Sequence, residues 1–324
     1  MRRLFAAVLA LCLLTALLAG CGAAPAAPTS DRLRIVCTIF PAWDWTREIL
    51  GDHAAEAELT LLLDDGVDPH SYQPTADDMI RVSAADLFVY VGGESERWVA
   101  DALKNAVNPG MRTVDLMATL GAAVRPEELT EGMQAEEDEG GEAEMDEHVW
   151  LSLRFARTLC AAICEQLCAL DAENAADYRA NCAAYAEQLD ALDLAYRQTV
   201  DAAPLRALVF GDRFPFRYLA EDYGLTCYAA FPGCSAETEA SFETILFLAG
   251  RVDALGVPCV LKIEGAQHRI AETIVENTAA RSQRILVLDS MQSTGAADAA
   301  GTTYLSVMEN DLAVLRCALG GTEE

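Results

Sequence analysis

The sequence predicts an α/β protein of two lobes, each with a small parallel sheet flanked by helices, joined by a long backbone helix. Three observations carry this prediction. Short apolar runs alternate with helical patterns, the alternation occurs twice along the chain, and a stretch rich in Ala, Leu, Glu and Gln separates the two occurrences. Apolar strands that alternate with helices are typical of parallel sheets covered on both faces.

The N-terminal lobe is predicted over residues 33–170. Its strands are expected at the apolar runs 33–40, 57–63, 86–93 and 111–116, and its helices at 43–50, 75–85 and 97–107. A helical pattern follows each of the first three strands. This order indicates crossover connections between parallel strands.

The connecting helix is predicted over residues 171–203. This stretch has neither Gly nor Pro, so nothing in it interrupts a helix that rises about 1.5 Å per residue. Two lobes joined by such a helix leave a cleft between the ends of their strands, where ligands of open α/β sheets usually bind.

The C-terminal lobe, residues 204–324, repeats the scheme. Strands are expected at 205–211, 225–231, 257–264 and 284–289, with helices at 237–255 and 303–319. The last helix is amphipathic, which indicates that one of its faces is buried.

The first residues have the pattern of an exported lipoprotein. An apolar run behind two arginines ends at Leu18, and small residues and Cys21 follow. This is the pattern of a secretory signal. The segment 18–21 resembles the bacterial lipoprotein processing site, which implies a signal peptide at 1–20 and lipid on the Cys21 sulfur. A tether at 21–32 would then hold the protein outside the cell, at the membrane. An uncleaved anchor is the alternative, but the apolar run is short for a span of about 20 residues.

The formal charge of −28 at pH 7 argues against nucleic acid and anionic membranes as partners. It suits an exported protein that meets cations. Beyond Cys12 and Cys21 nine cysteines remain, an odd number without the spacing of a zinc ribbon or a dense disulfide frame.

Three of these cysteines, Cys160, Cys164 and Cys168, are spaced to form one stripe along a helix. A thiolate metal site is one interpretation, but three sulfurs in a line along one helix face cannot close a tetrahedron alone. Buried small apolar residues are the favoured interpretation.

Four residues with metal-binding side chains follow predicted strands or precede a helix. His70 lies in the turn "DPHSYQPT" after the second strand, and His148 lies in "MDEHVWLSL" before a helical run. Glu264 and Asp289 end the last two strands of the C-terminal lobe. Each residue alone more often has a structural role, such as a helix cap. Together they predict a divalent-metal site across the cleft, with mixed nitrogen and oxygen ligands that suit zinc or manganese.

Longer segments carry a family resemblance. The segments are "TIFPAWDWTREILGD", "LLLDDGVDPHSYQPTADDMIRVSAADLFVYVGGESERWVADAL", "DEHVWLS" and "FPFRYLAEDYGL". They resemble the metal-binding component of bacterial zinc/manganese ABC importers, the cluster A-I solute-binding proteins, in order from about residue 33 to residue 318. The resemblance implies a monomeric receptor, not an enzyme, that binds zinc or, next, manganese between its lobes. It also implies delivery to a permease with its ATPase, and His70, His148 and Asp289 as ligands.

One position departs from the family pattern. Matching Tyr218 to the family's tyrosine places Arg213 where the family usually carries a third His or a Glu. A guanidinium only donates hydrogen bonds and cannot bind a cation. Three interpretations compete: Asp212, Glu264 or a water completes the metal shell; Arg213 turns away and pairs with a carboxylate; or the site binds metal more weakly. The first two together are favoured.

The segment "AAFPGCSAETEAS" adds Cys234 and Glu239 near the expected cleft. Cys234 as a soft ligand is an alternative, but buried cysteines are usually inert. His53 and His268 lie away from the strand ends and are interpreted as surface residues.

An acidic tract at 127–147 holds eleven Asp or Glu residues and three glycines. Dense like charge predicts a solvated loop. Family members that bind zinc often carry a His-rich loop at this position, so a second hypothesis is that these carboxylates concentrate divalent cations near the site.

A hydrolase and a chelate receptor are the two alternative functions. A zinc-dependent hydrolase needs a general base and an open coordination position, and the sequence has no HExxH motif and no nucleophile elbow. A receptor for a metal chelate or siderophore would need a basic cleft, which Arg213 and Arg217 indicate only weakly. The paired histidines argue against that receptor.

Overall fold

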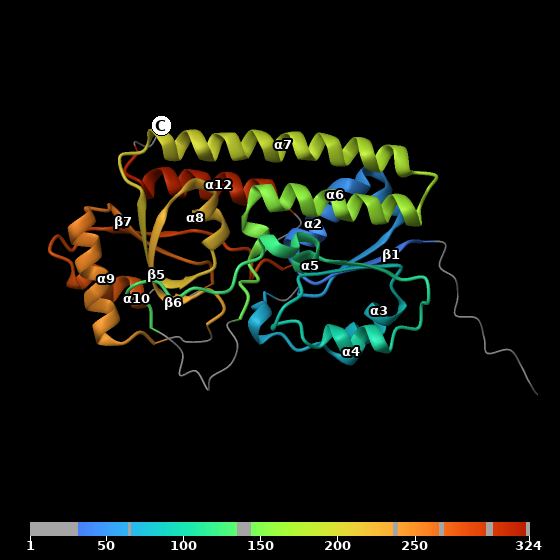
Figure 1. Cartoon of the computed structure of the whole chain (residues 1–324), viewed down its shortest axis with the longest axis horizontal. Coiled ribbons are helices and arrows are strands. Elements are labelled where there is room, and N and C mark those ends of the chain that lie inside the picture. Colours follow the sequence, from blue (N-terminus) through green and yellow to red (C-terminus); the bar gives the residue numbers. More distant parts are fainter. Residues whose placement is uncertain are drawn as a thin grey trace, which may run out of the picture. The chain divides into compact units, whose positions relative to one another are not determined.

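Two parallel four-stranded sheets organise the chain (Figure 1). The computed structural model describes residues 32–63, 66–134, 144–235, 239–265, 269–295 and 301–321. Residues 34–324 form one compact unit, which contains both sheets. The predicted signal peptide, Cys21 with most of its tether, the middle of the acidic tract at 135–143, and His268 lie outside the described residues.

The first sheet has the strand order β2-β1-β3-β4, with every neighbouring pair parallel. Its strands are β1 (Arg34–Cys37), β2 (Glu58–Leu61), β3 (Leu87–Tyr90) and β4 (Arg112–Asp115). The helices around it are α2 (Phe40–Leu50), α3 (Ala76–Ala84), α4 (Val99–Lys104) and α5 (Leu116–Leu120), with short 3₁₀ turns η1 (Gly51–Glu56), η2 (Pro69–Ser71), η3 (Gly121–Ala123) and η4 (Val149–Leu151).

The first predicted strand, 33–40, is too long. The strand ends at Cys37 and α2 already begins at Phe40. Pro41 lies in the first turn of α2, where its fixed φ favours the helix and its missing N–H costs nothing. The apolar residues after Cys37 therefore belong to a buried helix.

The second sheet has the order β6-β5-β7-β8 and is also parallel. Its strands are β5 (Ala207–Phe214), β6 (Thr226–Pro232), β7 (Cys259–Lys262) and β8 (Arg284–Val287), and its helices are α8 (Arg217–Tyr223), α9 (Phe242–Leu255), α10 (Arg269–Asn277) and α12 (Tyr304–Ala318). The β5 strand runs three residues beyond the predicted 205–211, through a register shift between Phe210 and Arg213. This extension brings Asp212 and Arg213 into the strand.

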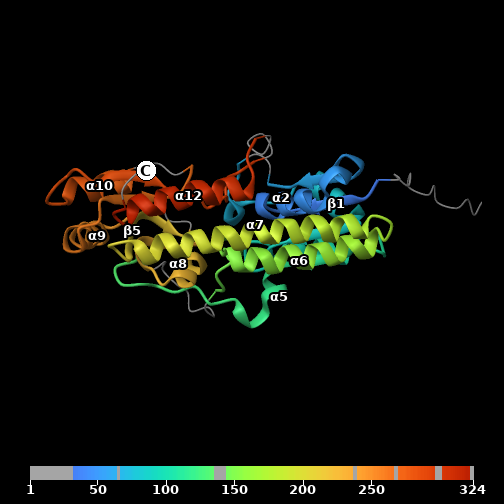
Figure 2. The same ribbon diagram turned by 90° about the horizontal axis from the view of Figure 1, so that it is seen from above.

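The long helix α7 (Ala175–Ala202) spans 28 residues, which corresponds to a length of about 42 Å. It contacts α6 (Leu153–Leu170) and α2 beside the first sheet, and α8 and α12 beside the second. Figures 1 and 2 show it running over both sheets, with α12 alongside it. A single continuous helix thus supports both halves, as the sequence predicts.

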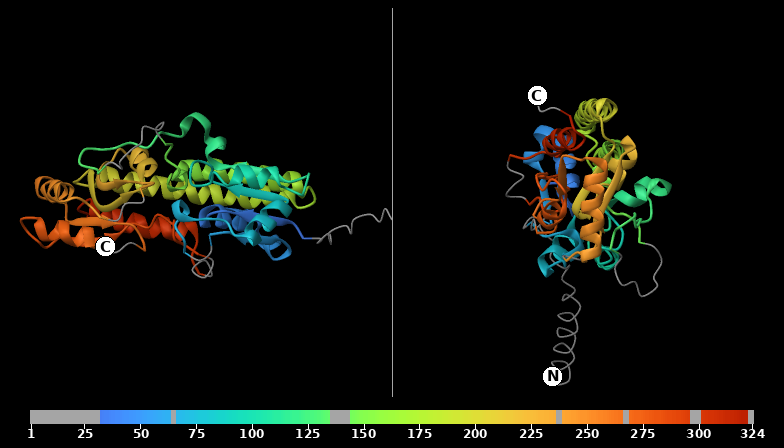
Figure 3. Two further views of the ribbon diagram at one scale, coloured as in Figure 1. Left: turned by 90° about the horizontal axis from the view of Figure 1, so that it is seen from below. Right: turned by 90° about the vertical axis from the view of Figure 1, so that its left-hand side faces the viewer.

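The last helix also joins the two halves. At its start, the Tyr304 N–H donates to Asp44 Oδ2 at 2.8 Å and the Tyr304 hydroxyl donates to the Trp150 carbonyl at 2.7 Å. Its ring lies edge-on to Trp45 with centroids 5.1 Å apart. Figure 3 shows α12 (red) reaching from the second sheet to α2 (blue). Buried aromatic contacts therefore tie α12 to the helices of the first lobe.

The cysteine stripe on α6 is buried, as predicted. Cys160, Cys164 and Cys168 are at most 8 % exposed, and the Cys164 and Cys168 thiols donate to carbonyls of Tyr178 and Ala175 at 3.6 and 3.5 Å. They fill the contact between α6 and α7. Within the described part of the chain, none of the helices combines the length and the apolar character that crossing a membrane requires.

Candidate metal centre

The first imidazole of the site is held by its own turn. After β2 the chain turns through Pro69 into η2, and Asp68 caps this turn by accepting the His70 N–H at 3.0 Å. The His70 ring then meets Ser95, whose Oγ lies 2.7 Å from Nδ1. A serine hydroxyl can accept from Nδ1–H, and in that arrangement Nε2 keeps its lone pair.

The second imidazole is fully buried. His148 is 0 % exposed and stands at the N-cap of η4. Asp146 Oδ1 lies 3.0 Å from the His148 N–H and 2.8 Å from Nδ1. Because an ionised carboxylate only accepts, Nδ1 carries the hydrogen, and Nε2 is left to face the cleft. This carboxylate–histidine contact is the arrangement that orients metal-binding histidines in proteins.

The two Nε2 atoms lie 3.2 Å apart. Two nitrogens bound to one tetrahedral zinc at 2.0–2.1 Å would be separated by about 3.3 Å, so the pair already has the spacing that a shared ion needs. Burial and the neighbouring His148 lower the pKa of His70 to about 3, so its imidazole is neutral. Burial opposes a charge on His148, but Asp146 overrides this and raises the pKa of His148. A metal bound by both Nε2 atoms needs both lone pairs, so any proton held between the rings must leave when the metal binds.

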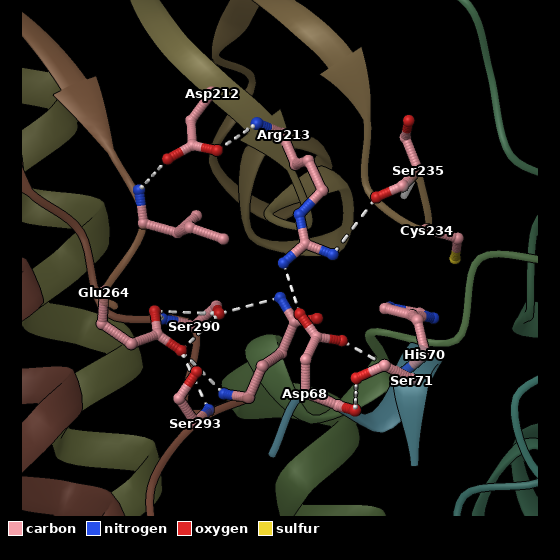
Figure 4. Close-up of polar contacts among 12 residues, drawn as sticks. Asp68, His70, Ser71, Asp212, Arg213, Cys234, Ser235, Glu264, Ser290 and Ser293 are labelled. Carbon is pink, nitrogen blue, oxygen red and sulfur yellow. Dashed lines mark hydrogen bonds and ion pairs between the residues drawn. The ribbon is translucent and has the colours of Figure 1, made fainter. Parts of the chain in front are cut away.

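A thiol completes the group. Among the described residues, one Nε2 or Nδ1 of His70 and of His148 and the Cys234 Sγ lie within 4.8 Å of one another. The sulfur of Cys234 points toward the His70 ring (Figure 4). Burial, followed by the carboxylates of Glu127, Asp146 and Glu147, raises the pKa of Cys234 well above its ordinary value. Without metal the group is therefore a neutral thiol.

Arg213 is paired with a carboxylate. Its guanidinium forms an ion pair with Asp68, and Nη1 donates to the Ser235 carbonyl at 3.3 Å. Figure 4 shows the guanidinium between these two partners. Burial opposes the charge of Asp68, but Arg213 overrides it and lowers the pKa of Asp68. The geometry agrees with the favoured interpretation of Arg213 as the partner of a carboxylate.

The predicted carboxylate ligands are engaged with backbone donors. Asp212 accepts the N–H groups of Arg213 and Ile263 at 2.8 and 3.2 Å. Asp289 Oδ1 accepts the Met291 N–H at 2.8 Å. The group of metal-binding atoms around the histidine pair consists, in the described chain, of His70, His148 and Cys234. Asp212, Glu264 and Asp289 stay predictions as ligands.

Glu264 holds the loop that follows β8. Its carboxylate accepts the N–H groups of Ser290, Gln292 and Ser293 at 2.7, 2.9 and 3.3 Å, and also the Ser290 hydroxyl (Figure 4). These bonds place Gln292, which sequence reasoning missed, with Oε1 3.4 Å from His148 Nε2. The amide oxygen therefore places an uncharged oxygen atom, which could bind a metal, beside the histidine pair. The nearest signal in the sequence is its position three residues after Asp289.

A cavity of about 870 Å³ lies between the His70 turn and the carboxyl ends of β5, β6 and β7. Its charged lining, in the described chain, consists of Asp68, Asp212, Glu239 and Glu264 and of Arg213 and Arg269. Carboxylates outnumber guanidiniums, and Asp68 neutralises Arg213. This balance favours a cation over an anionic chelate.

The ends of the acidic tract are ordered and attached to the second lobe. Glu127 and Glu144 join through a backbone hydrogen bond of 2.7 Å, and the Tyr218 hydroxyl accepts from Arg125 N and donates to the Asp146 carbonyl. Glu127 Oε1 accepts the Cys234 N–H at 2.8 Å. The tract therefore includes at least one carboxylate that supports the site, besides its solvated residues.

His53 lies in η1, where Nε2 is 3.1 Å from Asp177 Oδ2 and the side chain is 24 % exposed. It takes no part in the site. This agrees with its interpretation as a surface residue.

The chain matches a described protein family over most of its length. Residues 35–318 match the protein family described as zinc-uptake complex component A, periplasmic. The chain belongs to this family. Membership confirms the predicted family resemblance, and the family's description names a component of a zinc-uptake complex, not an enzyme.

Individual relatives agree with this assignment. The chain is 31 % identical over 286 residues to the zinc-binding lipoprotein AdcA of Streptococcus pneumoniae, covering 88 % of this chain and 55 % of that protein. It is 29 % identical to the high-affinity zinc uptake system protein ZnuA of Bacillus subtilis, covering 96 % of each. The chain thus spans about half the length of its AdcA relatives and nearly all of that ZnuA.

Solved structures confirm the two-lobe fold. The Zn(II)-bound ZnuA-like domain of Streptococcus pneumoniae AdcA superposes with a TM-score of 0.69 at 30 % identity, covering 89 % of this chain and 99 % of that domain. The periplasmic zinc-binding protein TroA of Treponema pallidum gives 0.72 at 25 % identity, covering 89 % and 99 %. Two parallel sheets flanked by helices are thus shared with these proteins.

Proposed function

We propose that this protein is the extracytoplasmic receptor of an ABC importer, which captures a divalent transition metal between its lobes and delivers it to the permease. The observation that carries the proposal is the 3.2 Å separation of the His70 and His148 Nε2 atoms, with Asp146 and Ser95 on the opposite ring nitrogens. Both rings direct Nε2 toward one point, and a hydrogen-bond partner at Nδ1 holds each ring in its orientation.

Zinc is the proposed cargo, with manganese next. Two imidazoles suit zinc, and the named relatives AdcA and ZnuA are a zinc-binding lipoprotein and a zinc uptake protein. His70 and His148 are the proposed imidazole ligands, and Asp289, with Glu264 or Asp212, is the proposed carboxylate contribution of the second lobe. Because donors come from both lobes, a modest shift of one lobe relative to the other would dismantle the site and release the ion.

The remaining parts of the proposal concern the cell. Lipid on Cys21 would anchor a monomer to the membrane, next to a permease and its ATPase. We place the lobes at 33–170 and 204–324, with 171–203 between them. The AdcA relatives named zinc-binding lipoprotein support the anchor, and the family described as a zinc-uptake complex component supports the partners.

Metal analysis tests the proposal. Protein purified without chelators is expected to contain one zinc per chain, and His70→Ala and His148→Ala are each expected to remove it. His53→Ala is the matched control, because His53 contacts Asp177 on the surface and should leave the metal content unchanged. Loss of zinc uptake in cells that carry His148→Ala, at limiting zinc, would connect binding with transport. Wild-type protein that binds no divalent metal would contradict the proposal.

A further inference from the structure

The turn after β6 brings a sulfur to the histidine pair from the opposite lobe. His70 and His148 precede α7 in the chain, whereas Cys234 follows β6 of the second sheet. We propose that Cys234 is the third protein ligand, so that the site binds its metal through two imidazoles and one thiolate. This inference rests on the proposed function, because it names the donor set and the metal preference of the same site.

The turn that carries Cys234 packs closely against the His148 ring. A Cβ on Gly233 would lie 2.9 Å from His148 Cε1 and 3.0 Å from the Phe214 carbonyl oxygen. A Cβ this close to the ring would force the ring or the turn to shift, so glycine is the residue that lets the backbone approach the buried imidazole without displacement. The backbone next to Cys234 is therefore placed by direct contact with a proposed ligand.

Two further contacts fix the same turn from other sides. Glu127 accepts the Cys234 N–H at 2.8 Å, and the carbonyl of Ser235 accepts from Arg213 Nη1 at 3.3 Å. Arg213 is held in turn by Asp68, two residues before His70. Arg213, which cannot bind metal, thus links the turn that carries Cys234 to the turn that carries His70.

The distances suit a tetrahedral ion. With Zn–S at about 2.3 Å and Zn–N at about 2.05 Å, a bound sulfur and nitrogen would be separated by about 3.5 Å. One ring nitrogen of each histidine and the Cys234 sulfur lie within 4.8 Å of one another without an ion, so a contraction of at most about 1.3 Å is sufficient. The fourth position is left for the carboxylate proposed above from Asp289, Glu264 or Asp212, for Gln292 Oε1, which lies 3.4 Å from His148 Nε2, or for a water.

Binding requires the thiol to lose its proton. The S–H bond breaks, the sulfur keeps the electron pair and donates it to the metal, and the proton leaves to solvent. The ion's charge stabilises the thiolate, as it does for coordinating thiols generally. Thiolate is a soft ligand, whereas manganese prefers oxygen donors. The site should therefore select zinc strongly over manganese.

Cobalt(II) reports a thiolate ligand directly. Wild-type protein titrated with cobalt is expected to show a sulfur-to-cobalt charge-transfer band in the near ultraviolet, and Cys234→Ser is expected to lose the band. Cys227→Ala is the matched control, because Cys227 is a buried free thiol near the start of the same strand, β6, and should keep the band. Zinc affinity of Cys234→Ser should fall on the order of 100-fold, since losing a group that only orients a ligand already costs roughly 10- to 100-fold.

A measurement on the wild-type chain avoids the risk that a variant misfolds. Zinc K-edge X-ray absorption of the zinc-loaded wild-type protein is expected to show one sulfur neighbour at about 2.3 Å, beside nitrogen or oxygen neighbours at about 2.0–2.1 Å. Stoichiometric cobalt binding without the charge-transfer band, or a zinc shell without sulfur, would overturn the thiolate ligand and leave the receptor intact. Wild-type protein that binds neither metal would overturn both.

Discussion

Arg213 and Asp68 form an ion pair that connects β5 of the second sheet with the turn that carries His70 of the first lobe. Both side chains are mostly buried, at 16 % and 23 % exposure. The pair stands beside the proposed metal centre and occupies the position where the family resemblance leads one to expect a ligand. It joins the lobes without the metal.

The pair should stabilise the fold. In a double-mutant cycle, Asp68→Ala and Arg213→Ala are expected to show a coupling of about 1–3 kcal/mol, between the values typical of exposed and of buried pairs. Urea unfolding of the metal-free protein measures it. The exposed pair Asp101–Lys104 is the control and should give less than about 0.5 kcal/mol. Equal coupling in both cycles would refute a specific link between the lobes.

Asp146 should control metal affinity through His148. Asp146→Asn replaces an obligate acceptor by an amide that can also donate, so the Nδ1–H tautomer is no longer enforced. Zinc affinity is expected to fall roughly 10- to 100-fold by calorimetry. Glu144→Gln, an exposed carboxyl close in the chain, should have no effect. An unchanged affinity for Asp146→Asn would show that this contact does not orient the ring.

Gly233 should be required for the approach of β6 to the histidine. Gly233→Ala forces either the turn or the His148 ring to move, and a cost of about 1–3 kcal/mol in stability is expected together with weaker zinc binding. Gly250→Ala is the control, since a Cβ there meets no atom within 4 Å and the residue lies inside helix α9. That change should stabilise the protein by roughly 0.5–1 kcal/mol. If Gly233→Ala binds zinc like the wild type, the close approach of Gly233 to His148 does not determine metal binding.

Glu96 should make stability depend on pH. The residue is 7 % exposed and accepts the Gly92 N–H at 2.9 Å. Burial raises the pKa of Glu96 from 4.5 to about 8, so the folded state holds the proton more tightly than the unfolded state. Stability is therefore lost as pH rises, by about 1.4 kcal/mol per unit between roughly 4.5 and 8.

Glu96→Gln should remove this dependence. In urea unfolding with chelator present, the free energy of unfolding of the variant is expected to rise relative to that of the wild type as pH rises through that range. Below that range the two free energies should be equal. Exposed Glu58→Gln serves as the control. Parallel pH profiles for the wild type and Glu96→Gln would contradict a buried neutral carboxyl.

Much of the fold follows from local patterns. The alternation of apolar strands and helices placed all eight strands to within a few residues, and the absence of Gly and Pro placed α7. The two histidines could be found because both stand where regular structure starts or ends. The early start of α2 was missed because an apolar run does not distinguish a buried strand from a buried helix.

The sequence predicts the second lobe's share of the site less well, with Cys234 only as a disfavoured alternative ligand and Gln292 not at all. Cys234 and Gln292 reach the histidines through contacts between distant segments, such as Gly233 against His148 and Glu264 with the loop at 290–293. Strand-end carboxylates suggest ligands in the sequence, but the loop N–H groups they satisfy become visible only in three dimensions.

Because Glu127 holds the Cys234 turn, a deletion that tests whether the acidic tract concentrates cations must spare Glu127. Deleting all of 127–144 would remove the residue that holds Cys234 and would confuse cation capture with loss of the site. Deleting 135–143 alone, and measuring zinc uptake at limiting metal, separates the two. Reduced uptake at unchanged zinc affinity is expected if the tract concentrates cations, and unchanged uptake would leave it a solvated loop.

The most direct test of the metal centre is anomalous diffraction from crystals of the zinc-loaded protein, collected at the zinc absorption edge. The predicted result is one peak within about 2.0–2.1 Å of both the His70 and the His148 Nε2 atoms and about 2.3 Å from the Cys234 sulfur. A peak bound to the histidines without the sulfur would reject the thiolate ligand alone. A peak confined to the acidic tract, or none between the two imidazoles, would contradict the receptor site itself.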